Sequence, residues 1–164
     1  MMKKNEYKSD KLRGIFRSDE HKEIVEKLAV RRHGIKKTSI FPTIKDLMCF
    51  AAMLGFSEGK RVPLSENHQK QDIQKQIFID DGKINNIFLI ALAETKDANI
   101  LRDDEETDIT KIFEEYANGG FEIIKSWEMD MPDDIEGDKF IVNGLIKHGY
   151  LKINEEGSEE PVNF

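Results

Sequence analysis

Residues capable of acid–base or nucleophilic chemistry are few in this chain, and they are scattered. Four histidines are present: His21, His33, His68 and His148. Each lies in a polar stretch, and none has a serine, cysteine or carboxylate at a spacing typical of a catalytic pair. We therefore interpret all four as surface histidines. Cys49 lies inside an apolar run, where a free thiol usually acts as a small buried hydrophobic group. No catalytic motif is present, and we expect no enzyme activity.

Metal and nucleotide sites have little support. The chain has no cysteine pair, no His-x-x-x-His sequence and no calcium-binding loop. Residues 103–108 are acidic enough to bind a metal or, with Glu114 and Glu115, to form a cryptic nuclease site. The favourable interaction of acids with a helix N-terminus explains them more simply. The Gly59-Lys60 pair lacks the first glycine of a phosphate-binding loop and the serine or threonine after the lysine. We expect no cofactor and no metal.

Basic residues supply the strongest functional signal. Residues 1–62 contain 15 Lys and Arg against 8 Asp and Glu, a net charge of +7, whereas residues 63–164 contain 10 against 24, a net charge of -14. The first part suits a polyanion, and the second suits a basic partner or repels nucleic acid. The candidate nucleic-acid-binding residues lie near the ends of two expected helices: Arg31, Arg32, Lys36, Lys37, Lys60 and Arg61.

Two interpretations of these six residues stay open. They form a polyanion-binding patch, or they complement helix dipoles on a solvated face. A helix-turn-helix is disfavoured, because the second expected helix is too apolar to lie in a DNA groove.

Length and composition suit one compact domain. The chain has 164 residues, of which 38% are hydrophobic and 35% charged, so we expect a modest core under a heavily charged surface. No secretory h-region follows the N-terminus, and no apolar stretch approaches 18 residues. We therefore expect neither secretion nor membrane insertion, and a cytoplasmic location.

Two helices must position the basic residues. Ser18 is a predicted N-cap, followed by an apolar face at helical spacing (Ile24, Val25, Leu28 and Ala29), with Arg31 to His33 in the last turn and Gly34 after its end. Thr43 and Asp46 resemble a capping box that begins a second, largely buried helix, and Gly55 is predicted to end it.

The remaining sequence also favours helices. The apolar run at 84–95 predicts another buried helix, and residues 109–117 predict one that Asn118-Gly119-Gly120 ends. A short helix follows at 121–127, and a last element closes on the core at 140–150, whereas residues 77–79 are too few to assign. The expected fold class is mainly α: a compact single-domain bundle of about five or six helices, with minor β content possible. The expected boundaries are a charged N-terminal arm (1–17), a helical domain (18–151) and an acidic C-terminal tail (152–164).

Three blocks of sequence carry a resemblance to a known family. They are IFPTIKDLMCFAAMLGF at 40–56 with GKRVPL at 59–64, IALAETKD at 90–97, and IFEEYANGGFEI at 112–123. In matching order, they resemble the small bacterial family called Dnd (DNA phosphorothioation) system-associated protein 4. That resemblance implies a role beside loci in which sulfur replaces an oxygen of the DNA backbone, with antiphage defence as context. The family has no established catalytic residues to carry over.

Charge and resemblance together lead to one hypothesis and one alternative. The hypothesis is a non-enzymatic accessory protein of a DNA-modification-linked antiphage defence system, which contacts DNA or a DNA-bound complex through its basic N-terminal half. The alternative is a protein–protein adaptor or oligomerising subunit without direct DNA contact, whose acidic half docks a basic partner or another copy of the chain.

Overall fold

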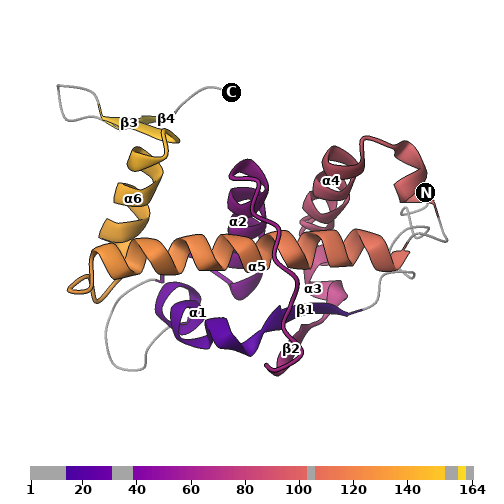
Figure 1. Ribbon diagram of the computed structural model, residues 1–164, viewed down its shortest axis with the longest axis horizontal. Coiled ribbons are helices and arrows are strands. Elements are labelled where there is room, and N and C mark those ends of the chain that lie inside the picture. Colours follow the sequence, from indigo (N-terminus) through magenta and orange to yellow (C-terminus); the bar gives the residue numbers. More distant parts are fainter. Residues whose placement is uncertain (1–13, 31–38, 103–105, 154–158, 162–164) are drawn as a thin grey trace.

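A computed structural model of the chain describes residues 14–30, 39–102, 106–153 and 159–161. Over these residues the fold is mainly α with a minor β component, as predicted (Figure 1). In chain order the elements are β1 (Ile15–Ser18), η1 (Asp19–His21), α1 (Lys22–Ala29), α2 (Ile44–Ser57), β2 (Lys70–Ile73), α3 (Lys75–Asp80), α4 (Ile84–Thr95), η2 (Ala98–Leu101), α5 (Glu106–Asp130), α6 (Asp138–Lys147), β3 (Leu151–Ile153) and β4 (Glu159–Pro161). None of the described helices is long and apolar enough to cross a membrane.

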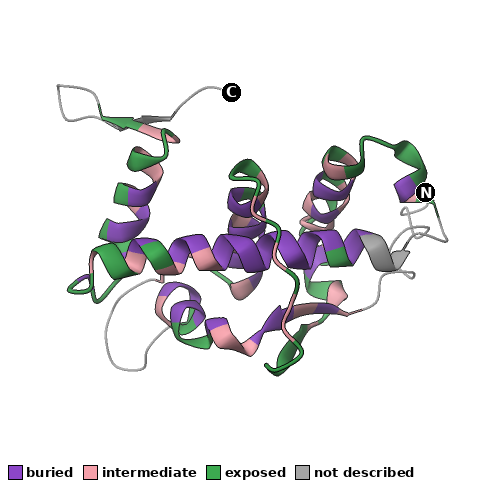
Figure 2. Cartoon of the chain, in the orientation of Figure 1, coloured by how far each residue is buried: buried purple, intermediate pink, exposed green. Residues whose placement is uncertain are grey.

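The 25-residue helix α5 is the axis of the fold. In Figure 1 it runs along most of the molecule, with α2, α4 and α6 on one side and α1, β1 and α3 on the other. Residues 112–121 of α5 are all buried, and Figure 2 shows the same stretch in purple. A helix buried on every side belongs at the centre of a core rather than at its edge.

The prediction that Asn118-Gly119-Gly120 ends a helix is wrong, because α5 continues through both glycines. The two glycines lie where other parts of the backbone come closest to α5. A methyl group on Gly120 would overlap the carbonyl oxygen of Ala51, and one on Gly119 would overlap that of Lys60. Each glycine costs a helix about 1 kcal/mol relative to alanine. Burial of Phe113 and Phe121, which are fully buried, stabilises the fold by about 3–6 kcal/mol. This gain exceeds the cost of the two glycines, so the residues stay helical.

Helix α2 begins where the sequence predicted. The Thr43 hydroxyl oxygen accepts a hydrogen bond from the backbone N–H of Asp46 at 3.1 Å and donates one to the Asp46 carboxylate at 2.7 Å. The prediction that Gly55 ends the helix is wrong by two residues. Gly55 faces α5, where a methyl group would overlap the carbonyl oxygen of Tyr116, so this glycine is required by packing and not by helix termination.

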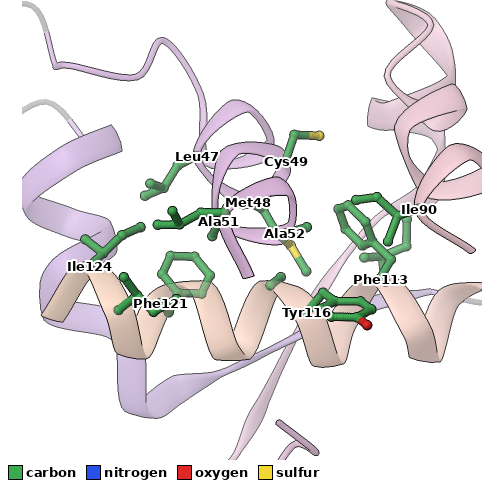
Figure 3. Packing of buried hydrophobic residues seen from close by; sticks show 14 of the residues in the cluster. Leu47, Met48, Cys49, Ala51, Ala52, Ile90, Phe113, Tyr116, Phe121 and Ile124 are labelled. Carbon is green, nitrogen blue, oxygen red and sulfur yellow. The ribbon is translucent and has the colours of Figure 1, made fainter. Parts of the chain in front are cut away.

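The α2–α5 contact is the largest between two described elements, and it forms the centre of the core (Figure 3). Met48 and Ala51 of α2 lie against α5, where Phe121 and Ile124 meet them. Cys49 is buried, as predicted, but Figure 3 shows it on the side of α2 away from α5. Burial raises the pKa of its thiol, which keeps it protonated.

Helix α1 has the predicted apolar face, but Ser18 caps the 3-10 turn η1, and the α-helix itself begins at Lys22 and ends at Ala29. Its four apolar residues are buried, and the Ser18 hydroxyl accepts the N–H of Glu20 across the preceding turn. Val30, which follows Ala29, is extended, and the carbonyl oxygen of Leu28 accepts the N–H of Phe41 at 3.0 Å. The predicted last-turn residues Arg31, Arg32 and His33 lie outside the described residues. Gly34 lies outside the described residues.

Short strands occur near both ends of the described chain. β1 pairs antiparallel with β2, with Ile15 opposite Ile73, and β3 pairs antiparallel with β4. Three residues of the predicted N-terminal arm, 15–17, thus belong to β1, and Ile15 is completely buried. The sequence of β2, Lys-Gln-Asp-Ile, has no strand signal because its face is exposed.

Candidate nucleic-acid interface

The predicted basic residues Lys60 and Arg61 lie in the loop after α2, and this loop is packed against α5. The N–H of Lys60 donates to the carbonyl of Gly55 at 2.8 Å, and the N–H of Val62 donates to the carbonyl of Glu115 at 3.0 Å. The Lys60 ammonium lies 2.9 Å from a carboxylate oxygen of Glu122 on α5. The backbone of this loop is therefore part of the fold rather than a free surface loop.

Arg61 is held by two carboxylates. Its Nε donates to Glu115 at 2.6 Å, and one terminal nitrogen donates to Glu94 at 3.1 Å. Burial opposes the charge of the guanidinium, but Glu115 and Glu94 outweigh it and raise the pKa of Arg61. Arg61 also lies over the ring of Tyr116, 5.9 Å from its centre. A phosphate would have to compete with these partners for Arg61.

Tyr116 completes this network from α5. Its hydroxyl donates to the second oxygen of Glu94 at 2.6 Å. That hydrogen bond, with Arg61, lowers the pKa of Glu94. Burial together with Glu94 raises the pKa of Tyr116 to about 12. The loop after α2, the end of α4 and the middle of α5 are thus joined by one set of charged contacts.

The other four predicted residues, Arg31, Arg32, Lys36 and Lys37, lie outside the described residues. The residues on both sides of them contact one another. Val30 follows the end of α1, and the hydrogen bond from the N–H of Phe41 to the carbonyl of Leu28 brings the two flanks together. The Ser39 hydroxyl donates to the carbonyl of Phe41 at 2.8 Å. α1 itself is tied to α5 by an ion pair between Lys27 and Glu128, at 2.6 Å.

The two oppositely charged parts of the sequence meet inside the fold. Six of the fifteen cations in residues 1–62 are described: Arg17, Lys22, Lys27, Lys45, Lys60 and Arg61. Four of the six form ion pairs with carboxylates from residues 63–164, and these pairs are Lys27–Glu128, Lys45–Asp81, Lys60–Glu122 and Arg61 with Glu94 and Glu115. Most of the described cations of residues 1–62 are therefore paired within the fold.

An apolar groove lies between α2 and α4. It has a volume of about 220 Å³, and its walls include Met53, Phe56, Leu89, Ile90 and Ala93. Met53 is 55% exposed and Leu89 is 61% exposed. Exposed large apolar side chains gathered at one groove are typical of protein contact surfaces.

The interpretation of His21 as a surface residue is wrong. Its side chain is 1% exposed, and its ring stacks on Phe121 with a centre-to-centre distance of 4.9 Å. Its Nε2 lies 2.5 Å from the side-chain oxygen of Asn118. The sequence did contain a signal, because His21 continues the helical spacing of Ile24, Val25 and Leu28. Asn118, treated only as part of a helix stop, is the residue that sequence reasoning missed.

The carboxylates considered for a nuclease site have structural partners. The side chain of Glu114 accepts the N–H of Phe16 at 2.9 Å, and Glu115, 8% exposed, binds Arg61. Residues 103–105 lie outside the described chain. Within the described part, no group of three histidine, cysteine, aspartate or glutamate side chains is arranged to hold a metal ion.

Comparison with known proteins identifies the family. The family model for DNA sulphur modification system-associated protein 4 matches residues 15–146, from the first residue of β1 almost to the end of α6. No match was found among curated proteins or among solved structures. The match covers most of the chain and includes α1, α2, α4 and α5, and it agrees with the resemblance carried by the three sequence blocks. The chain therefore belongs to the family of DNA sulphur modification system-associated protein 4.

Proposed function

We propose that this protein is a non-enzymatic accessory component of a phosphorothioation-linked antiphage defence system, and that it contacts DNA or a DNA-bound complex through the basic residues Arg31, Arg32, Lys36 and Lys37. The family supports an association with a DNA sulphur modification system. Companion components of that system are the proposed partners.

The observation that carries the DNA contact is the charge of residues 31–37. They include four cations and no carboxylate in seven positions. Lys60 and Arg61 differ from them, because both already have carboxylate partners within hydrogen-bonding distance. We therefore assign the phosphate contacts to residues 31–37 and a fold-stabilising role to Lys60 and Arg61.

Binding to duplex DNA across a salt series tests this proposal. If each of the four cations neutralises one phosphate, these residues contribute a slope of about -3.6 to the plot of the logarithm of the association constant against the logarithm of the salt concentration. Replacing all four with serine should remove binding at moderate salt and flatten that slope. The matched control replaces four exposed lysines elsewhere (Lys70, Lys111, Lys139 and Lys152) with serine, which changes the net charge equally. Equal losses in both variants, or no binding by the unaltered protein, would contradict direct contact.

The contacts of Glu114 and Glu115, two carboxylates considered for a nuclease site, support the proposal of a non-enzymatic role. Glu114 and Glu115 are buried and hold β1 and Arg61 respectively, so their lone pairs are committed to the fold. Divalent-dependent nicking of plasmid DNA by the purified protein would overturn this part of the proposal.

A protein–protein adaptor is the second candidate. The specific observation in its favour is the groove between α2 and α4 with its exposed Met53 and Leu89. An adaptor without DNA contact shows no duplex binding at any salt concentration. The salt series therefore separates the two candidates.

A further inference from the structure

His21 connects three parts of the fold through one side chain. It lies between β1 and α1, and its Nε2 faces the side-chain oxygen of Asn118 on α5. The Asn118 amide nitrogen in turn donates to the carbonyls of Val62 and Pro63, at 3.3 and 3.2 Å. The His21–Asn118 pair therefore joins β1–α1 and the loop after α2 to the same position of α5.

This geometry determines where the His21 ring carries its proton. The two backbone carbonyls around Asn118 accept hydrogen bonds only, so they orient the amide nitrogen toward themselves and its oxygen toward His21. The oxygen accepts only, so Nε2 of His21 must be the N–H donor. Nδ1 then carries a lone pair in the neutral ring. Nδ1 is buried and has no hydrogen-bond partner among the described residues.

A second proton would have to enter at Nδ1, where nothing described accepts it. Charged groups face the ring from each neighbouring element. Lys125 on α5 and Arg17 on β1 disfavour the charged ring, whereas Glu20 on η1, with an oxygen 3.6 Å from Nε2, favours it. Glu20 is shared, because its other oxygen lies 3.6 Å from Nε2 of His68. Burial is the largest effect and lowers the pKa of His21, whereas the hydrogen bond to Asn118 raises it; the net shift is downward.

We propose that His21 is a proton-sensitive latch, which holds the segment Ile15–Ala29 on α5 when the ring is neutral and releases that segment when the ring is protonated. The released segment lies outside the α2–α5 contact, which is the central contact among the described elements. Three further polar contacts join the same segment to α5: the Glu114 carboxylate accepts the N–H of Phe16 at 2.9 Å, the Lys125 ammonium donates to the carbonyl of Glu20 at 2.7 Å, and Lys27 pairs with Glu128. In the proposed latch, His21 supplies the pH dependence.

The direction of the pH dependence follows from the protonation state of the His21 ring in the packed and in the released segment. The packed segment excludes the second proton, while the released segment accepts it with the ordinary histidine pKa of 6.5. The latch is therefore complete above pH 6.5 and weakens as the pH falls below it. The equilibrium constant for release rises by up to about tenfold per pH unit below 6.5.

Two measurements on the intact chain test the latch. Nitrogen NMR of the histidine rings should show His21 as the neutral Nε2–H form at pH 7.5. Amide hydrogen exchange, corrected for intrinsic rates, should show that protection in α1 falls about tenfold more than protection in α2 between pH 7.5 and 5.5. A fully protonated His21 beside a protected α1 would overturn the proposal.

Two matched variants test whether the His21 ring causes the pH dependence of protection in α1. His21→Gln keeps an N–H donor for Asn118 and cannot titrate, so α1 should lose its extra pH dependence. His68→Gln removes the exposed histidine near Glu20 and should leave that dependence intact. Loss of the dependence in His68→Gln would contradict the assignment. If His21→Gln fails to fold, the NMR and exchange data on the unaltered chain still decide the question.

Discussion

Polar side chains in this protein lie at the contacts between elements. Asn118 joins His21 to the loop after α2, Asp134 accepts the N–H groups of Gly137 and Phe140 at the start of α6, and Arg61 joins α4 to α5. Buried polar groups are stable only when paired, so each such contact selects one arrangement of its elements. Among the candidates for chemistry that the structure describes, His21, Glu114 and Arg61 serve as such connections.

Tyr116 gives a residue-scale prediction. Its hydroxyl donates to Glu94, and its pKa is raised to about 12. In a spectroscopic titration, one tyrosine of the native protein should ionise about two pH units later than the ordinary value of 10.0. Because the folded state favours the neutral phenol, this contribution to stability is complete below pH 10 and is lost as the pH rises through 12.

The variant Tyr116→Phe checks the assignment. It should remove the late titration and lower the free energy of unfolding by about 1 kcal/mol, the usual net value of one hydrogen bond, as measured by urea unfolding at pH 7. Tyr150→Phe is the control, because burial and a hydrogen bond to a different carboxylate, Glu58, also raise the pKa of Tyr150, and this variant should keep the titration near pH 12. A late titration that survives in Tyr116→Phe would show that another tyrosine is responsible.

At the scale of elements, the crossing of α2 over α5 depends on glycines in both helices. Gly55 of α2 meets the carbonyl of Tyr116, and Gly120 of α5 meets the carbonyl of Ala51. Small residues at a crossing let two backbones approach, and the surrounding Phe113 and Phe121 then fill the space beside the contact. The same residue type would end a helix in a solvated position, which explains why sequence reasoning misassigned both sites.

Gly120→Ala tests this account, because helix propensity alone predicts a more stable variant, whereas the close contact predicts a less stable one. Alanine is the better helix former by about 1 kcal/mol, so an exposed glycine replaced by alanine would stabilise the protein. Here we expect a loss above about 3 kcal/mol, because the added methyl overlaps backbone that cannot move without separating the helices. Urea unfolding measures the change. Lys111→Ala, at an exposed position of α5, should change stability by less than about 0.5 kcal/mol. Unchanged or higher stability in Gly120→Ala would contradict the close contact.

At the scale of the whole molecule, folding brings the basic and acidic parts of the chain together. Lys27, Lys60 and Arg61 from the basic part all pair with carboxylates of α5 or α4. Charges that are paired within one chain offer little to a second copy.

The mass of the protein in solution tests the oligomerising form of the adaptor alternative. Because opposed charges are paired internally, we expect light scattering to give 19.0 kDa, the mass of one chain, at both low and high salt. A larger mass at low salt that falls toward one chain at high salt would instead support head-to-tail assembly through the charged surfaces.

Local patterns in the sequence determined the elements whose signals are local. The caps at Ser18 and Thr43, the buried faces of α1, α2 and α4, the mainly α fold class and the family could all be predicted, because capping and helical periodicity act over a few residues. The polar strand β2 and the continuity of α5 through Gly119 and Gly120 could not, because each depends on a partner distant in sequence.

The properties of the candidate site were likewise determined partly by the sequence and partly by the tertiary structure. Sequence alone determined that the cations gather in residues 1–62, but only the tertiary structure decided that Lys60 and Arg61 face carboxylates of α4 and α5. It also decided that His21 is buried against Asn118, 97 residues away. Charge and residue type are properties of the chain, whereas the solvation and partners that give them an effect depend on which distant segments fold together.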